Sequence, residues 1–157
     1  MKVTTLFLKS AVLLIGLVVL GLSVFGLPKL AAFSTTANPE FAYLKWPVML
    51  GLFMTEIPFF LALYQSFKLL RLIENKDAFS EEAVKSLSQI KINALVITLL
   101  YVSGALFLSS QKALHPGVAL IGIVIIFTSV TIFVFAAVLQ GLLGHALEFK
   151  SENDLIV

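Results

Sequence analysis

Four long stretches without a charged side chain, one of them with a single exception, constrain this chain more than any other feature of its sequence. They cover residues 10–28, 47–67, 92–111 and 113–147, and the exception is Glu56 in the second. A helix needs about 20 residues to cross a hydrocarbon core of about 30 Å. The sequence therefore predicts an all-α integral membrane protein with four membrane-spanning helices.

The composition agrees with this prediction. Of the 157 residues, 59% are hydrophobic and 13% are charged, and the mean hydropathy is +1.03. Soluble domains have about 45–50% apolar and about 25% charged residues, so a water-soluble fold of this length could not bury so many apolar side chains. We expect the lipid bilayer to be the main partner of the chain.

We expect a single four-helix transmembrane bundle over residues 1–157. The predicted helices cover approximately residues 8–27, 47–73, 81–110 and 118–148. Ser80 is the expected N-cap of the third helix, because Glu81 and Glu82 follow it and complement the positive end of the helix dipole. Helices three and four should extend beyond the membrane into the cytoplasm.

The first stretch has a second interpretation. Lys2 and Lys9 followed by an apolar core are also typical of a secretory signal peptide. However, the core is long and no A-x-A cleavage site follows it, so we favour an uncleaved first membrane helix.

Lysine and arginine residues predict the orientation. Eight of them lie before the first helix, between helices two and three, or after helix four, whereas three lie in the other two connections. Positive residues concentrate on the cytoplasmic side. Both termini should therefore face the cytoplasm.

Glu56 is the feature most suggestive of chemistry. Counted from Pro47, it lies about 15 Å into the second helix, near the middle of the bilayer. An ionised carboxylate there costs at least about 2.5 kcal/mol, and the four apolar cores contain no Lys or Arg. Its charge must be relieved by protonation, a hydroxyl, a freed backbone carbonyl or water.

Pro58 lies two residues after Glu56 and cannot donate a hydrogen bond to the Met54 carbonyl, so it should kink the helix. A kink beside a buried carboxyl suits a binding or switching site, and it equally suits a structural hydrogen bond between helices. Hydroxyl side chains at similar depth on helices three and four are the candidate partners of Glu56: Thr98, Tyr101, Thr128, Ser129 and Thr131.

Other chemistry finds little support in the sequence. The absence of cysteine excludes disulfides, thiolate metal sites and cysteine nucleophiles. His115 and His145 are predicted on opposite sides of the membrane, so they cannot share a metal. We expect no metal, no cofactor and no enzymatic activity, and the net charge of +2 is too small to indicate direct nucleic-acid binding.

Two segments resemble a known family. These are "IPFFLALYQSFKLLRLIENKDAFSEEAVKSLSQI" (57–90), with an N-K-x-x-F-S loop, and "FVFAAVLQGLLGHALEFKSENDLIV" (133–157), with a closing K-S-E-N-D-L. Together they resemble the bacterial membrane family known as domain of unknown function 2975. The resemblance implies four helices over nearly the whole chain and a location in the inner (cytoplasmic) membrane of a bacterium. It supplies no established activity. It also implies that a small helix-turn-helix regulator is often encoded beside the gene.

The first hypothesis is therefore a non-enzymatic sensing or regulatory component that acts with such a cytoplasmic regulator. The residues expected to dock it lie in the central loop and the tail: Asn75, Lys76, Phe79, Ser80, Lys150, Asp154 and Leu155.

Two alternatives remain open. One is a small proton- or solute-handling protein that uses Glu56 and that would need a homo-oligomer, because four helices are few for a transporter. The other is a resistance or immunity protein that binds an external peptide through residues 28–45.

Overall fold

The computed structural model describes residues 2–156, with side chains described as far as Asn153, and its regular elements in this range are all helical. Four of its helical stretches are long and apolar enough to cross a membrane. This confirms the predicted all-α protein with four membrane-spanning helices. The elements, in order, are α1 Lys2–Gly21, the π-helical segment η1 Leu22–Gly26, α2 Leu27–Ala37, the 3₁₀ segment η2 Pro39–Leu44, α3 Lys45–Glu74, α4 Glu81–Ser110 and α5 Pro116–Ile156.

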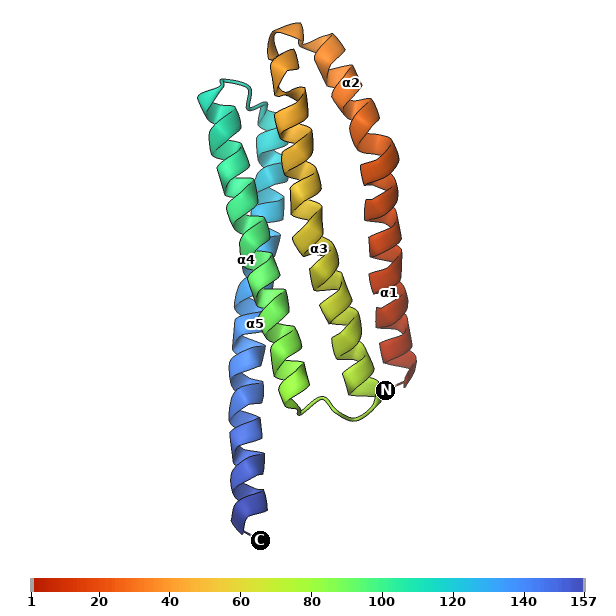
Figure 1. Ribbon diagram of the computed structural model, residues 1–157, viewed down its shortest axis with the longest axis vertical. Coiled ribbons are helices and arrows are strands. Elements are labelled where there is room, and N and C mark those ends of the chain that lie inside the picture. Colours follow the sequence, from red (N-terminus) through yellow and green to blue (C-terminus); the bar gives the residue numbers. More distant parts are fainter. Residues whose placement is uncertain (1, 157) are drawn as a thin grey trace.

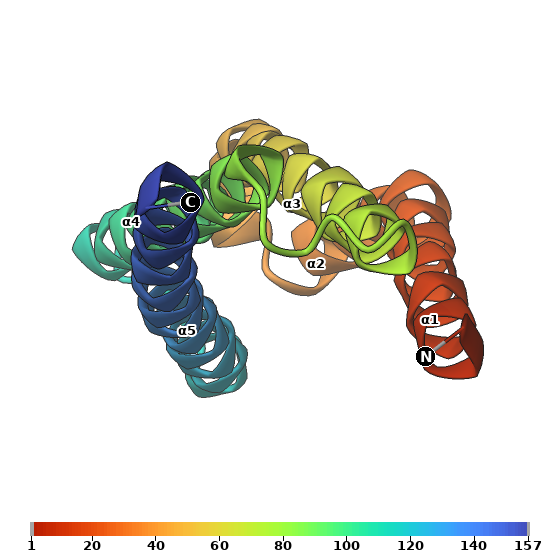
Figure 2. The ribbon, with the colours of Figure 1, turned by 90° about the horizontal axis from the view of Figure 1, so that it is seen from below.

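The long helices form an open, curved row. Helix α1 packs against α3, α3 against α4, and α4 against α5 (Figure 1). Viewed along the helices, α1 and α5 lie at opposite ends of the row (Figure 2). Within the described residues, α1 has no extensive contact with α4 or α5. The four helices therefore do not close around a common core, and most apolar side chains face outward, as a lipid solvent allows.

The interior of the row is built from small side chains. On α4 the buried residues recur on one helical face, and the buried positions Ser129 and Ala136 on α5 are seven residues apart. Small residues allow helix backbones to approach closely, which favours association in a bilayer. The buried residues of α4 are Ala83, Ser86, Leu87, Asn93 and Ala94.

The start of α4 agrees with the sequence prediction. Ser80 has an extended backbone, and its side chain accepts a hydrogen bond of 3.3 Å from the Ala83 backbone N–H. Glu81 and Glu82 occupy the first turn. The predicted N-cap is confirmed.

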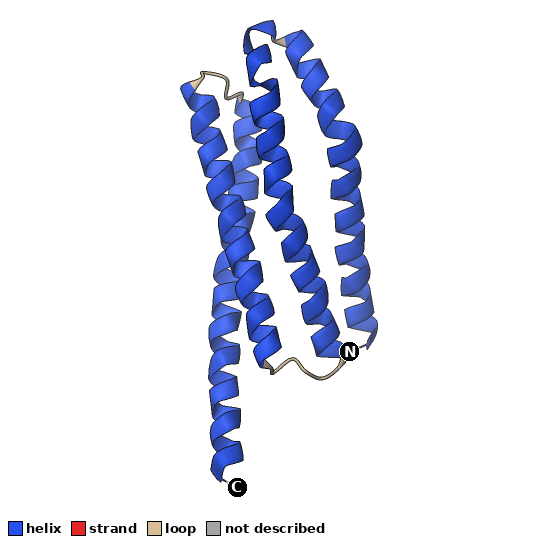
Figure 3. Cartoon of the chain, viewed as in Figure 1, coloured by secondary structure: helices blue, strands red, loops and turns tan. Residues whose placement is uncertain are grey.

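Helices α3 and α4 end in the same way, in a Schellman motif with a lysine in the left-handed region. Lys76 has φ 62° and Lys112 has φ 56°. At the first end, Asp77 N–H donates to the Leu72 carbonyl at 2.8 Å, and at the second, Ala113 N–H donates to the Leu108 carbonyl at 2.9 Å. These bonds satisfy carbonyls that the helix leaves open. Loops are confined to short connections between the helices (Figure 3).

The first helical stretch is longer than the predicted 8–27. It continues without a break through η1 and α2 to Ala37, so most of residues 28–45 is helical. Pro28 lies in the first turn of α2, where a missing N–H is tolerated.

Helix α5 is the longest element and extends past its neighbours. Its 41 residues span about 62 Å, twice the hydrocarbon thickness of about 30 Å. Its C-terminal end projects beyond the level of the connection between α3 and α4 (Figure 1). The N-terminus, this connection and the end of α5 all lie toward the same end of the molecule.

Candidate functional site: a carboxyl between two membrane helices

Glu56 lies in the middle of the second helical stretch, 17 residues from Pro39 and 18 from Glu74. Ser23 Oγ lies within hydrogen-bonding distance of Glu56 Oε1. Ser23 is only 3% exposed and belongs to η1. The polar partner of the carboxyl therefore comes from the first helical stretch, across the interface between α1 and α3.

Ser23 also contacts its own helix. Its Oγ lies 2.7 Å from the carbonyl oxygen of Val19, to which it donates. The surrounding η1 segment is closed by an i→i+5 bond from Leu27 N–H to the Leu22 carbonyl. Single π-helical turns inside α-helices are rare and frequently occur at functional sites. The irregular turn in the first stretch therefore coincides with the residue that meets the half-buried Glu56 carboxyl.

The structure gives Glu56 a different partner from those suggested by the sequence. Thr98 donates to the Ala94 carbonyl at 2.9 Å, within its own helix. Thr128 and Thr131 likewise donate to the Val124 and Phe127 carbonyls, each at 2.8 Å, and both are exposed on α5.

The two remaining candidates are Tyr101, which is half-buried on α4, and Ser129, which is buried on α5. Helix α3 packs mainly against α1 and α4, so the α5 hydroxyls are far from the Glu56 interface. The depth of a residue in the membrane does not reveal which helices are neighbours, so it could not exclude the α5 hydroxyls.

The sequence did contain one indication of the true partner of Glu56. Ser23 is the one polar side chain between Ser10 and Lys29.

Pro58 is buried in α3, and α3 remains helical on both sides of it. Because proline has no N–H, the carbonyl of Met54 lacks its usual donor. Phe59 and Phe60 follow directly, with ring centroids 5.4 Å apart and an interplanar angle of 77°. The side chains of these three residues therefore offer the carboxyl no polar partner.

A second polar link joins α1 to α3 near the N-terminus. Lys9 Nζ lies 2.6 Å from Glu74 Oε2, and both side chains are partly buried. The same ammonium lies 5.3 Å from the centroid of the Phe67 ring. Sequence analysis did not identify this pair, whose members are 65 residues apart.

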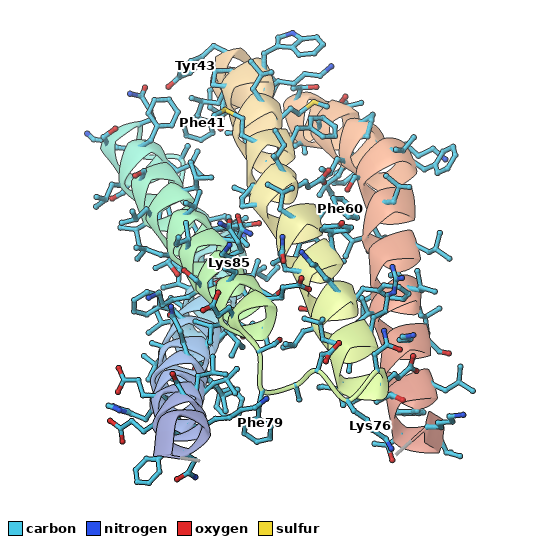
Figure 4. The ribbon with its side chains drawn as sticks, turned by 60° about the horizontal axis from the view of Figure 1, so that its bottom comes forward. Phe41, Tyr43, Phe60, Lys76, Phe79 and Lys85 are labelled. Carbon is cyan, nitrogen blue, oxygen red and sulfur yellow. The ribbon has the colours of Figure 1, made fainter. Side chains whose placement is uncertain are left out.

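Between the two links, Gly16 of α1 faces α3. A Cβ at this glycine would lie 3.4 Å from Leu63 Cδ1 and 3.9 Å from Phe60 Cε1. Figure 4 shows Phe60 on the side of α3 that faces α1. The interface therefore has a close apolar contact at Gly16 and a polar link on each side of it along the helix.

The proposed docking residues lie at one end of the molecule. Asn75, Lys76 and Lys150 are exposed, and Phe79 is 62% exposed and projects from the connection between α3 and α4 (Figure 4). Ser80 is also the N-cap of α4. The side chains of Asp154 and Leu155 lie outside the described residues.

Metal-ligating side chains do not gather in the part of the chain that the structure describes: no group of three or more His, Cys, Asp or Glu could hold an ion there. His115 precedes α5, and its Nδ1 accepts a hydrogen bond of 3.0 Å from Gly117 N–H. His145 lies about 45 Å further along α5, 3.8 Å from Glu148.

Comparison with known proteins agrees with the architecture. The model of the family described as "Protein of unknown function (DUF2975)" matches residues 29–157. The chain belongs to this family. It is 46% identical over 158 residues to a protein of Bacillus subtilis (strain 168) described as "Uncharacterized membrane protein YoaS", and the match covers 99% of each chain. No solved structure matches.

The family resemblance expected from the motifs is thus confirmed, and the chain is a multi-pass membrane protein in contact with lipid. The family match includes Glu56 and begins after Ser23. The bridge between these residues therefore connects the matched region to the helix that precedes it.

Proposed function

We propose that this chain is the non-enzymatic membrane component of a regulatory pair in the bacterial cytoplasmic membrane. It docks a small helix-turn-helix regulator on the end of the molecule that carries the α3–α4 connection and the end of α5. The excess of lysine and arginine at this end supports its location in the cytoplasm.

The extension of α5 is the observation that carries the proposal. A helix of about 62 Å greatly exceeds what crossing the bilayer needs. Its last described side chains, from Glu148 to Asn153, are all exposed and mix both charges with Phe149. A helix that leaves the membrane and keeps an exposed, mixed-charge surface suits recognition of a soluble protein.

The neighbouring connection offers charge complementarity to a DNA-binding protein. A hollow of about 360 Å³ is lined by Asp77, Ser80, Glu81 and Glu82, and Phe79 beside it is exposed. Proteins that bind DNA carry clustered Lys and Arg on the surface that meets the phosphates. An acidic hollow would attract that surface and so compete with DNA for the regulator.

Co-purification tests the proposal. The full-length chain is co-expressed with a helix-turn-helix regulator of the kind often encoded beside genes of this family and is solubilised in a mild detergent. The captured regulator is then quantified. Phe79→Ala should reduce capture about tenfold or more, since removal of a central aromatic anchor costs about 2 kcal/mol or more. The double variant Glu81→Lys, Glu82→Lys should reduce it as well.

The controls make the same chemical changes at the other end of the molecule. Phe33→Ala removes an aromatic residue that is also well exposed, and Glu40→Lys reverses a charge there. Both should leave capture unchanged. Equal capture by the wild type, the Phe79 variant and the double variant would contradict the proposed docking surface.

A further inference from the structure

Three oxygen atoms meet between α1 and α3: Ser23 Oγ, the Val19 carbonyl oxygen and Glu56 Oε1. Ser23 Oγ is within hydrogen-bonding distance of both of the others. A hydroxyl carries one hydrogen and can therefore donate one hydrogen bond. The Val19 carbonyl can only accept, so two contacts compete for the single hydrogen of Ser23.

A proton on Glu56 resolves the competition. Ser23 then donates its hydrogen to Val19, and the protonated carboxyl donates to a lone pair of Ser23 Oγ. With an ionised carboxylate, one of the two oxygen pairs would have no hydrogen between its members, which is repulsive in a medium of low dielectric constant.

Six other hydroxyls favour the same assignment. Each donates to the carbonyl four residues earlier in its own helix: Ser10, Thr36, Ser66, Thr98, Thr128 and Thr131. Ser23 makes the same local bond to Val19. If its hydrogen is used as in these six residues, the hydrogen in the contact with Glu56 has to come from the carboxyl.

The surroundings provide no positive charge for an ionised carboxylate. On the first helical stretch, Lys9 is paired with Glu74, and Lys29 is exposed about 9 Å along the axis from Ser23. On α4, the titratable group closest to the level of Glu56 is Tyr101, and Lys91 lies about 12 Å nearer to the α3–α4 connection. On α3 itself, Tyr64 is exposed and Lys45 is near the start of the helix.

The spacing also distinguishes a proton from a metal ion. Octahedral Mg²⁺ at 2.0–2.1 Å places adjacent ligand oxygens about 2.9 Å apart, and the larger Ca²⁺ separates them further. Ser23 Oγ and the Val19 carbonyl are 2.7 Å apart, a normal separation for an O–H···O hydrogen bond.

We propose that Glu56 is a proton-binding site within the membrane: the hydrogen in its contact with Ser23 belongs to the carboxyl, which donates it in a hydrogen bond to Ser23 Oγ and so links α1 to α3. The proposal does not depend on the regulatory partner.

Infrared difference spectroscopy of the full-length protein in lipid nanodiscs at pH 7 tests the site. A protonated carboxyl has a C=O stretch at a frequency where carboxylates do not absorb. We expect this band in the wild-type protein, a downward shift of the band in D₂O, and its loss in Glu56→Gln. Ser23→Ala should keep the band and move it to higher frequency, because the carboxyl loses its hydrogen-bond acceptor.

Several outcomes would overturn the proposal. They are the absence of a protonated-carboxyl band in the wild type, an unchanged band in Glu56→Gln, and an unchanged frequency in Ser23→Ala. If Glu56→Gln does not fold, as judged by circular dichroism, the wild-type band and its shift in Ser23→Ala still decide the question.

Docking of α1 provides an independent measurement. The chain has no cysteine, so spin labels can be placed uniquely at the exposed positions Thr4 and Arg71. Glu56→Gln retains a donor for Ser23 and should preserve the wild-type distance distribution, whereas Glu56→Ala should broaden it. Identical distributions in all three proteins would contradict the role of the bridge in holding α1.

Discussion

The interface between α1 and α3 and the interface between α4 and α5 hold their helices in different ways. Helices α4 and α5 pack along much of their length, and the buried residues Ser129 and Ala136 of α5 are small. Helix α1 has far less contact with α3, and two polar links are conspicuous there: Ser23 with Glu56 and Lys9 with Glu74.

The difference reflects the physics of a lipid solvent. Lipid tails are as apolar as leucine, so burial of an apolar side chain provides little drive for helices to associate. Close packing of small residues and interhelical hydrogen bonds provide it instead. The α4–α5 interface uses the first mechanism along its length, whereas the α1–α3 interface depends on the second at two points. We therefore expect α1 to separate from the row before α4 or α5 does.

Enlarging a small residue in the packed interface should have the largest effect. Ala136 is 3% exposed, and Ala136→Leu should destabilise the protein by about 1–3 kcal/mol, because the helices would have to move apart. Unfolding of the detergent-solubilised protein by SDS measures the change. Val138→Leu, at a position that is 55% exposed, is the control and should have little effect. Equal losses would show that the α4–α5 interface is not closely packed.

Breaking the Ser23–Glu56 bridge should have a smaller effect that is concentrated on α1. In a double-mutant cycle, Ser23→Ala and Glu56→Ala should show a coupling energy of about 0.6 kcal/mol and at most about 1.7 kcal/mol, the range for interhelical hydrogen bonds in membranes. Thr128, which bonds within its own helix, is the control, and Thr128→Ala should not couple to Glu56→Ala. Additive losses for Ser23 and Glu56 would mean that the bridge contributes nothing.

A substitution in the turn between α4 and α5 should increase the stability of the protein. Lys112 adopts φ 56°, a conformation that costs L-residues about 1–2 kcal/mol and glycine almost nothing. Lys112→Gly should therefore stabilise the protein by about 0.5–1 kcal/mol, once the greater freedom of glycine in the unfolded chain is subtracted. A rise in melting temperature would be the sign of this gain. Ser103→Gly, within α4, should lower it.

Removing the Lys9–Glu74 pair should have the smallest effect. The pair is partly exposed, so salt should screen it. Lys9→Met should accelerate amide hydrogen exchange in the first turns of α1 at low salt, and much less at high salt, without affecting α4. Lys68→Met, which removes an exposed lysine, should leave exchange in α1 unchanged. An effect of Lys9→Met that is independent of salt would assign the role of Lys9 to packing against Phe67.

Features that depend on local sequence were predictable. The four helical stretches follow from the length of the apolar runs, and the start of α4 follows from Ser80, Glu81 and Glu82. Glu56 was identified because a carboxylate in the middle of an apolar run has an obvious energetic cost. Each of these inferences needs only residues that are near one another in the chain.

The partner of Glu56 was not predictable in the same way. The candidates were chosen by depth on the third and fourth stretches, whereas the hydroxyl came from the first, at the η1 turn. A π-helical turn shifts the following side chains around the helix axis, so the helical repeat does not show where Ser23 points. The Lys9–Glu74 pair likewise requires knowledge that the start of α1 meets the end of α3.

The amino-acid sequence by itself determined that this chain is an α-helical membrane protein with four spans, because apolar length and bilayer thickness are compared along one dimension. Only the tertiary structure decided that the helices form an open row and that Ser23 is the partner of Glu56. In lipid, burial of apolar surface does not specify which helices are neighbours or how each is rotated. Close packing of small residues and a few polar bridges make that choice, and both depend on the arrangement of the helices in three dimensions.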